Sequence, residues 1–212
     1  MQTIWWYDAV KWCNARSQQA GRAPLYYTDT SLTQLYTNGL NDLIYVNWAA
    51  NGYALPTEAQ WEKAARGGLS GQSFPWGNVI SESLANYWGC SSGCGFAYDL
   101  GPNNPNPVFS ATGTNPAGYF APNGYGLFDM AGNVFEWCWD WYGTGKNGSD
   151  DYQANSTNPT GPATGSNRVV RGCAWDSDVL TAYASSARCA NRSPNPPGLA
   201  DYSIGFRCVR GL

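Results

Sequence analysis

Histidine is absent from all 212 residues, and its absence excludes several kinds of catalytic site. Ser-His-Asp and Cys-His catalysis require an imidazole base, and most zinc centres and iron facial triads require imidazole ligands. Charged residues are also few: they make up 13% of the chain, and the net charge is −3. The sequence contains no basic cluster. We therefore expect no binding to nucleic acid.

Long apolar runs are missing as well. No stretch approaches the roughly 20 apolar residues that a membrane helix needs, so no membrane insertion is expected. Met1 leads directly into Ile4-Trp5-Trp6-Tyr7, which is not the pattern of a signal peptide. The sequence thus leaves the location undefined, and display on a cell surface or a virion is compatible with it.

Aromatic residues and turn-forming residues are abundant. The chain has 11 Trp, 14 Tyr, 25 Gly and 13 Pro, and 43% of its residues are apolar. This length and composition suit one domain over residues 1–212, rich in loops and held together by aromatic packing. We expect a monomer.

The seven cysteines fall into different surroundings. Cys13, Cys138 and Cys208 lie among apolar or aromatic residues and are predicted to be buried free thiols. Cys90 and Cys94 lie in a Ser/Gly-rich loop, where a local disulfide and two reduced thiols are both compatible with the spacing. Without histidine or a second such pair, a zinc site is not expected.

Two segments carry helix signals. One covers about Tyr7 to Gln19, starts without a Ser, Thr or Asn cap, and stops at Gly21. The other covers Glu58 to Arg66, where Thr57 and Gln60 form a capping box and Gly67-Gly68 marks the end. Short strands are expected at residues 26–27, 44–46, 135–139, 168–171 and 205–209.

Several phrases along the chain together resemble one family. They are Trp6-Tyr7-Asp8-Ala9-Val10-Lys11-Trp12-Cys13-Asn14, Leu55-Pro56-Thr57-Glu58-Ala59-Gln60-Trp61-Glu62, Phe74-Pro75-Trp76-Gly77, Pro122-Asn123-Gly124-Tyr125-Gly126-Leu127-Phe128-Asp129-Met130, Gly132-Asn133-Val134-Phe135-Glu136-Trp137, Arg168-Val169-Val170-Arg171-Gly172 and Gly205-Phe206-Arg207. In this order they closely resemble the formylglycine-generating-enzyme (sulfatase-modifying factor) family. The resemblance implies an α+β, C-type-lectin-like fold with two helices, short antiparallel strands and long irregular loops. Family members usually carry a further N-terminal β segment, and this sequence starts at the first helix.

The residues that carry the family's chemistry are not at the matching positions. Formylglycine generators of the family that this sequence resembles hold copper with two cysteines five residues apart. In this sequence Ser177 stands at the first of these positions. Cys173 and Cys189 are sixteen residues apart and do not match the pair. Related iron-dependent sulfoxide synthases need three histidines. The sequence therefore predicts a protein that is not an enzyme and requires no cofactor, with a copper-dependent oxidase as the alternative.

The segment at about residues 173–204 looks variable. It has neither helical nor strand periodicity, and it contains no Lys, Gln, Glu or Met. This part of the chain resembles the variable region of proteins that are diversified by retroelements. These elements mutate adenines in a template that rewrites the target gene. The residue types that do occur in the segment are those that an Asn codon can encode after its adenines are replaced. Trp175 is expected to stay fixed and to be a large aromatic residue of the core. The predicted ligand-contact residues are Cys173, Ala174, Asp176, Ser177, Asp178, Val179, Leu180, Thr181, Tyr183, Ser185, Ser186, Cys189, Ser193, Asn195, Leu199, Asp201, Tyr202 and Ser203.

A surface of this kind predicts a broad macromolecular ligand, either a protein or a surface glycan. Tyr183, Tyr202 and Leu180 would anchor it, and Asp176, Ser177 and Asp178 would supply adaptable polar contacts. A third hypothesis is a carbohydrate-binding module without a variable surface, in which the aromatic run Trp137 to Tyr142 stacks on sugars. The same run is also compatible with a core strand that supports the variable surface.

The resemblance further implies structural Ca²⁺ sites. Asp129, the carbonyl groups of Gly132 and Val134, and Glu136 match one of them, and such hard oxygen ligands suit Ca²⁺. Asn86 and Asp99 are candidates for a second site. The alternative is that Asp129 and Glu136 only form hydrogen bonds within their turn.

Overall fold

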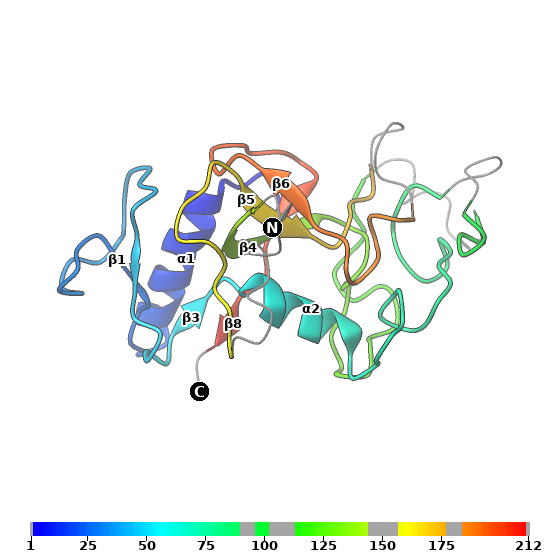
Figure 1. The fold of residues 1–212 in the computed structure, drawn as a ribbon, viewed down its shortest axis with the longest axis horizontal. Coiled ribbons are helices and arrows are strands. Elements are labelled where there is room, and N and C mark those ends of the chain that lie inside the picture. Colours follow the sequence, from blue (N-terminus) through cyan, green and yellow to red (C-terminus); the bar gives the residue numbers. More distant parts are fainter. Residues whose placement is uncertain (1, 90–95, 102–112, 144–156, 177–183, 211–212) are drawn as a thin grey trace.

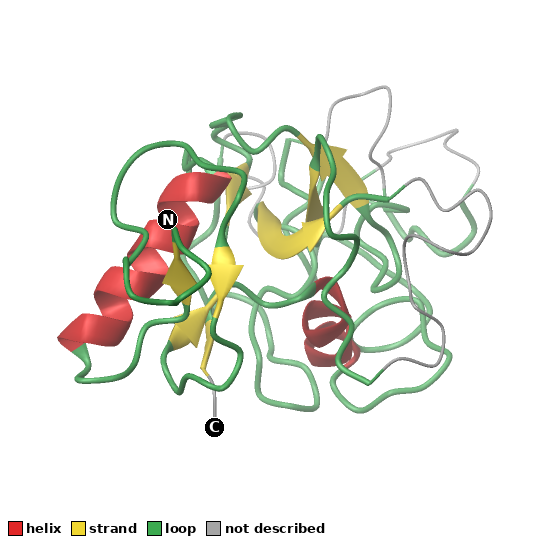
Figure 2. Cartoon of the chain, turned by 60° about the vertical axis from the view of Figure 1, so that its left-hand side comes forward, coloured by secondary structure: helices red, strands yellow, loops and turns green. Residues whose placement is uncertain are grey.

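The computed structural model describes residues 2–89, 96–101, 113–143, 157–176 and 184–210. In these residues two helices, α1 (Trp6–Gln19) and α2 (Glu58–Arg66), accompany eight short strands. Figures 1 and 2 show the helices apart from one another, with strands between them. The strands are β1 (Tyr26–Tyr27), β2 (Tyr45–Val46), β3 (Tyr53–Ala54), β4 (Phe135–Trp141), β5 (Arg168–Arg171), β6 (Ser193–Asn195), β7 (Ile204–Gly205) and β8 (Val209–Arg210).

The helix predictions are confirmed. α1 begins at Trp6, one residue before the predicted start, and its entry at Trp5 has no side-chain cap. α2 has the predicted bounds and the full capping box, and Gly67 ends it in the left-handed conformation. Its apolar face buries Trp61 and Ala65, which pack toward β4 and β5.

The central sheet has the order β6-β5-β4-β7. β4 and β5 are antiparallel, with Trp137 opposite Val170, and the register shifts between Trp137 and Trp141. β7 runs parallel to β4, which departs from the expected antiparallel pairing. The two small sheets β1-β2 and β3-β8 lie on the side of α1 (Figure 1).

The strand expected at residues 205–209 is wrong in its extent. The chain pairs with β4 only at Ile204–Gly205, then leaves the central sheet and pairs with β3 at Val209–Arg210. The segment that the sequence pattern presents as one strand therefore pairs with two different strands. β3 and β6 were not expected, because two or three residues such as Ser193-Pro194-Asn195 carry no strand period.

Three clusters of buried side chains form the core. The largest joins α1 and β1 to β4 and is strongly aromatic, as the composition predicts; Trp6, Tyr26 and Trp139 belong to it. Cys13 and Cys138 are buried free thiols as expected, whereas Cys208 is free but only half-buried. Cys90 and Cys94 lie outside the described residues. In the described part of the chain, no helix is long and apolar enough to cross a membrane.

Candidate ligand-binding surface

The segment that was predicted to vary begins where β5 ends. Gly172 and Cys173 both have positive φ angles, +98° and +73°. At Gly172 a Cβ atom would lie 3.0 Å from the ring of Trp61, so glycine suits both the angle and the close approach. The Gly172 carbonyl also accepts a hydrogen bond from Gly132 N–H at 2.7 Å. The entry to the segment is therefore fixed by backbone geometry.

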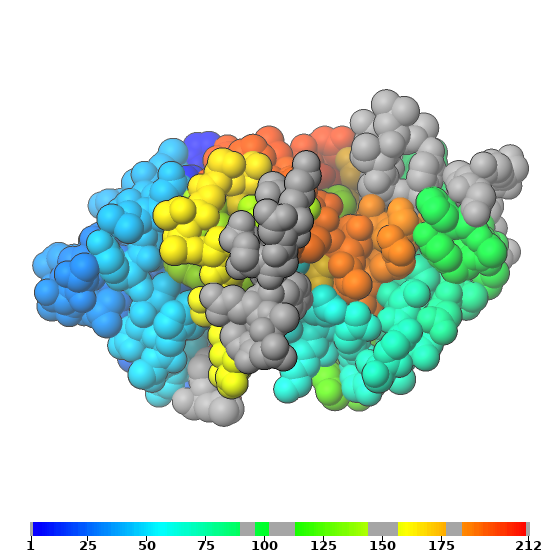
Figure 3. Space-filling view, in the orientation of Figure 1, coloured from blue at the N-terminus to red at the C-terminus, as the bar shows by residue number. Residues whose placement is uncertain are grey.

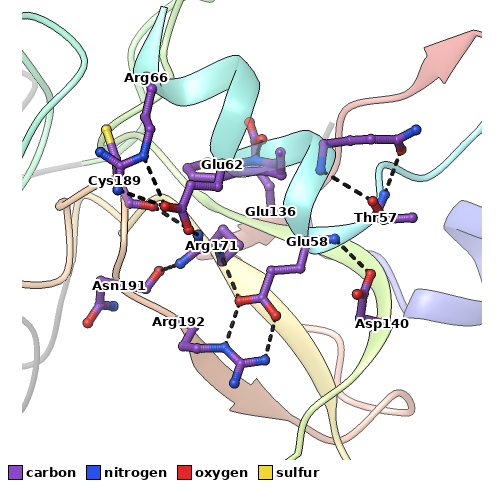
Figure 4. A network of polar contacts seen from close by, with 12 residues as sticks. Thr57, Glu58, Glu62, Arg66, Glu136, Asp140, Arg171, Cys189, Asn191 and Arg192 are labelled. Carbon is purple, nitrogen blue, oxygen red and sulfur yellow. Dashed lines mark hydrogen bonds and ion pairs between the residues drawn. The ribbon is translucent and has the colours of Figure 1, made fainter. Parts of the chain in front are cut away.

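The return of the chain is fixed by a buried arginine (Figure 4). Arg171 is fully buried at the end of β5. Its Nη2 lies 2.6 Å from Glu62 Oε2 and donates to the Cys189 carbonyl at 2.9 Å, and its Nη1 donates to the Asn191 carbonyl. One guanidinium thus joins β5, α2 and residues 189–191.

A second arginine completes the same network. Arg192 binds both carboxylate oxygens of Glu58, with Nε 2.7 Å from Oε1, and Glu58 is almost fully buried at the start of α2. The Glu58 N–H donates to Asp140 Oδ2 at 2.7 Å, which adds β4 to the network. Burial, together with the neighbouring Glu58 carboxylate, raises the pKa of Asp140 to about 7. Because removing one partner from a buried ion pair is costly, these contacts hold both flanks of residues 173–189 on the scaffold.

The predicted contact residues fall into four groups: exposed, half-buried, buried, and outside the described residues. Tyr202 is 53% exposed and Leu199 is 38% exposed, so these side chains are accessible. Half-buried positions are Asp176, Ser185, Ser193, Asn195, Asp201 and Ser203. Ser177, Asp178, Val179, Leu180, Thr181 and Tyr183 lie outside the described residues.

Four of the predicted contact residues are buried, and their assignment to an exposed surface is wrong in this conformation. They are Cys173, Ala174, Ser186 and Cys189. Cys173 packs in a cluster with Phe74 and Tyr87, and Cys189 packs in another with Trp61. The sequence predicted an exposed position for these residues because they lie in a stretch without helical or strand periodicity. Their burial depends on packing against residues that are far away in the chain.

Several of the accessible positions come together beside β7. The rings of Trp175 and Tyr202 lie 5.8 Å apart, so the start of the segment meets the loop before β7. Trp175 N–H donates to the Asn133 carbonyl at 3.0 Å, and Asp201 Oδ1 accepts from Ser203 N–H at 2.7 Å. Figure 3 shows residues 184–200, in orange, at the surface on one face of the molecule.

Two other positions lie on the edge strand β6, and one lies near the middle of the segment. Ser193 is opposite Val170, and Asn195 is opposite Arg168. Ser185 lies in the turn 184–187, where Ala184 and Ala187 pack in the cluster of Phe74. The predicted surface therefore extends along β6 and is not one compact patch.

Sequence reasoning missed two features of this region. Trp175 was expected to be a core residue, but it is half-buried and forms part of the surface next to Tyr202. The network of Glu58, Arg171 and Arg192 was also missed. The charged residues that bracket the apolar pair Val169-Val170 are the signal that could have indicated it, because a charge on a core strand needs a buried partner.

The thiols of this region are poorly suited to hold copper. Cys173 and Cys189 are both buried, and they belong to different core clusters. Burial raises the pKa of Cys189 to about 11, so it is a neutral thiol at physiological pH. A soft metal site requires thiolates. Within the described ranges, no three His, Cys, Asp or Glu side chains form a group that could hold a metal ion.

The first predicted Ca²⁺ site has an arginine where the cation would bind. Arg207 Nε lies 2.5 Å from Glu136 Oε2, its Nη2 lies 2.7 Å from Oε1, and Trp61 Nε1 donates to Oε2 at 2.7 Å. Asp129 accepts from Gly118 N–H at 2.7 Å, as the hydrogen-bonding alternative expects. Gly132 and Val134 line an open cleft of about 710 Å³ with these residues. Since Glu136 is already neutralised, this set does not fit Ca²⁺ in the observed arrangement.

The second predicted site fits better at one residue. Asn86 Oδ1 is buried and has no hydrogen-bond partner, so it is a carbonyl oxygen that a cation could satisfy. Asp99 instead accepts from Tyr87 OH at 2.6 Å and from Gly101 N–H at 3.0 Å. Calcium at these residues stays a prediction.

With the fold and this surface defined, comparison with known proteins places the chain in a family. The model of the sulfatase-modifying factor enzyme 1-like domain matches residues 1–212, and the chain belongs to this family. The resemblance inferred from the sequence motifs is confirmed, and so is the α+β, C-type-lectin-like fold.

Two kinds of relative stand out. Among curated sequences, the formylglycine-generating enzyme of Thermomonospora curvata is 39% identical over 173 residues, which cover 80% of this chain and 52% of the enzyme. The serine/threonine-protein kinase pkn1 of Chlamydia pneumoniae is 38% identical over 180 residues, which cover 80% of this chain and 24% of that protein. The chain thus spans about half the length of the first of these relatives and a quarter of the second.

Among solved structures, Treponema denticola variable protein 1 has a TM-score of 0.73 and 28% identity, and the match covers 98% of this chain and 69% of that protein. CarF has a TM-score of 0.67 and 27% identity, with 100% and 67% covered. The family therefore includes relatives named as enzymes, and the fold is shared with a protein named as variable.

Proposed function

We propose that this protein is a non-enzymatic ligand-binding protein that displays a variable C-terminal surface. In this proposal a diversity-generating retroelement rewrites the codons of about residues 173–204. Tyr202 and Leu199 contact a macromolecular ligand as exposed anchors, and Asp176, Ser193 and Asn195 supply polar contacts around them.

The observation that carries the proposal is the contrast between the flanks and the contents of the segment. Arg171 and Arg192 hold the flanks through buried ion pairs with Glu62 and Glu58. Residues after them, by contrast, are open to solvent: Leu199 is 38% exposed and Tyr202 is 53% exposed. A scaffold that is stabilised independently of its exposed side chains tolerates changes in them. The likeness to Treponema denticola variable protein 1, whose name describes it as variable, supports the proposal of a variable surface on this fold.

The residues available for chemistry favour a binding protein over an oxidase. Ser177 stands where the family's first cysteine is expected, and the chain has no histidine. Cys189 is a buried thiol with a raised pKa. A copper-dependent oxidase would need two accessible thiolates close together, and neither Cys173 nor Cys189 supplies one.

Sequencing the gene's surroundings tests the proposal directly. We expect a reverse-transcriptase gene nearby, and a near-copy of the 3′ end of this gene that differs from it at adenine positions. In natural populations, substitutions should concentrate at codons for exposed residues such as Leu199 and Tyr202, and should spare those for Arg171 and Glu58. The absence of both the reverse transcriptase and the near-copy would remove the proposed mechanism.

An oxidation assay tests the alternative. The protein is incubated with Cu(I) and a cysteine-containing peptide, and the peptide is analysed by mass spectrometry for conversion of cysteine to formylglycine. We expect no conversion. Turnover that is abolished by Cys173→Ser or Cys189→Ser would establish the oxidase and overturn the proposal.

A further inference from the structure

A second concave region lies outside the predicted variable surface. It is a cleft of about 440 Å³, within the range of volumes that is typical of small-molecule sites. It is lined by residues 42–46, Trp48 and residues 160–163, together with Trp139, Trp141 and Arg168. Figure 3 shows these two segments next to one another, in light blue and yellow. None of the predicted ligand-contact residues lines this cleft.

The walls of the cleft are aromatic. Trp48 is 48% exposed, so a large part of its indole surface is accessible. Its ring stands at 87° to that of Trp139, with the ring centroids 5.9 Å apart, so the two indoles form a corner. Trp139 and Trp141 are largely buried and act as the rigid floor of this corner. Ile44 and Pro162 extend the apolar lining.

Two charged groups belong to the lining, in addition to the hydroxyl-bearing residues Tyr45 and Thr160. Arg168 is 1% exposed, and its guanidinium lies between the rings of Trp6 and Trp141, at 3.7 Å and 3.3 Å from their centroids. Its Nη1 donates to the Trp139 carbonyl at 2.6 Å, but its Nε is buried without a hydrogen-bond partner. A buried, unpartnered donor on a cleft-lining side chain is a costly feature that a ligand acceptor, or a water molecule, would satisfy.

The second polar group is the carboxylate of Asp42. Its Oδ1 accepts a hydrogen bond from Tyr7 OH at 2.5 Å, and the residue is exposed at the rim of the cleft. A carboxylate has about four acceptor positions, so it keeps capacity for further donors such as ligand hydroxyl groups. The cleft therefore presents an acceptor, a cationic donor and indole surfaces to one occupant.

We propose that this cleft binds a neutral saccharide residue. A pyranose ring has an apolar face of C–H groups that can pack on an indole, and hydroxyl groups at its edge that can donate to Asp42 and accept from Arg168. A wholly apolar ligand would leave Arg168 Nε without a hydrogen-bond partner, and an anionic ligand would be repelled by the Asp42 carboxylate. The site is independent of the proposed variable surface.

Ligand-observed NMR and calorimetry with simple glycosides test this site. The probes are the methyl glycosides of glucose, galactose, mannose and N-acetylglucosamine, each added to the intact protein. We expect at least one to bind, and Trp48→Ala to weaken its binding by at least about tenfold. Asp42→Asn should weaken it less, because the amide still accepts one hydrogen bond. Trp48→Phe, which keeps an aromatic face, should retain most of the affinity.

Two variants serve as matched controls. Trp88 is exposed to a similar extent, 43%, and does not line the cleft, so Trp88→Ala should bind as the parent does. Tyr202→Ala should also leave glycoside binding unchanged, whether or not it affects a ligand of the variable surface. The proposal is overturned if none of the glycosides binds when it is added at about 20 mM, a concentration high enough to detect even a very weak interaction. It is equally overturned if Trp48→Ala binds normally, or if Tyr202→Ala abolishes binding.

Discussion

The buried frame and the exposed surface of this protein are built by different interactions. The frame, which we define as Trp137, Glu58, Asp140, Arg171 and Arg192, joins α2, β4, β5 and the C-terminal loop through packing and buried charge pairs. The surface beside β7, by contrast, includes Tyr202 and Trp175, whose rings touch and remain partly open to solvent. We expect most of the stability to come from the frame, which the proposed function requires if the surface is to change.

The largest expected effect comes from the central tryptophan of the frame. Trp137 is fully buried on β4, and its Nε1 donates to the Ile4 carbonyl at 2.9 Å. Trp137→Ala should reduce the free energy of unfolding by about 3–5 kcal/mol, because it leaves a large cavity. Trp175→Ala should cost only about 1–2 kcal/mol, since its ring is half-buried. Urea unfolding of both variants measures the difference; equal costs would place Trp175 in the core.

Removing the charge of Glu58 tests the ionic part of the frame. Glu58→Gln leaves the guanidinium of Arg192 without its carboxylate partner and removes the carboxylate 3.5 Å from Arg171 Nε. We expect a loss of about 3–5 kcal/mol in the free energy of unfolding. The control is Asp8→Asn, which removes the more exposed pair with Lys11 and should cost less than about 1 kcal/mol. Equal losses in the two variants would contradict a structural role for the buried network.

The raised pKa of Asp140 predicts a pH dependence within the frame. Burial moves this pKa from its ordinary value of 3.8 to about 7. The folded state therefore binds more protons than the unfolded state between these values, and the contribution of Asp140 to stability is lost as the pH rises from about 4 to 7. The whole change is at most about 4 kcal/mol.

Asp140→Asn isolates this effect. The amide oxygen can still accept from Glu58 N–H, but it does not titrate. We expect the variant to gain stability relative to the parent as the pH rises from 4 to 7. Unfolding free energies measured at several pH values test this, and a constant difference between variant and parent would contradict the raised pKa.

The smallest effects are expected at the surface. Asp176→Ala, Ser193→Ala and Tyr202→Ala should each change the free energy of unfolding by less than about 0.5 kcal/mol. Combined in one chain, they should leave the thermal midpoint close to that of the parent. If the combined variant unfolds like Trp137→Ala, these side chains belong to the scaffold, and the contrast between frame and surface fails.

Local signals identified most of the regular structure. The Thr57 and Gln60 capping box and the left-handed Gly67 define α2 within a few residues, so its bounds follow from the sequence. The family motifs likewise indicated the α+β fold and the β5 strand Arg168–Arg171. The pairing of β3 with β8 could not be predicted, because it joins residues about 150 positions apart through only two residues on each side.

What the sequence determined alone was the family, the two helices and the absence of the family's catalytic cysteine at position 177. Tertiary structure decided which residues of the C-terminal segment are accessible. Cys173 and Cys189 turned out to be buried, and Arg207 binds Glu136 where the motif suggested Ca²⁺. The reason is physical: helix caps depend on neighbours three or four residues away, whereas burial and charge pairing depend on side chains that only folding brings together.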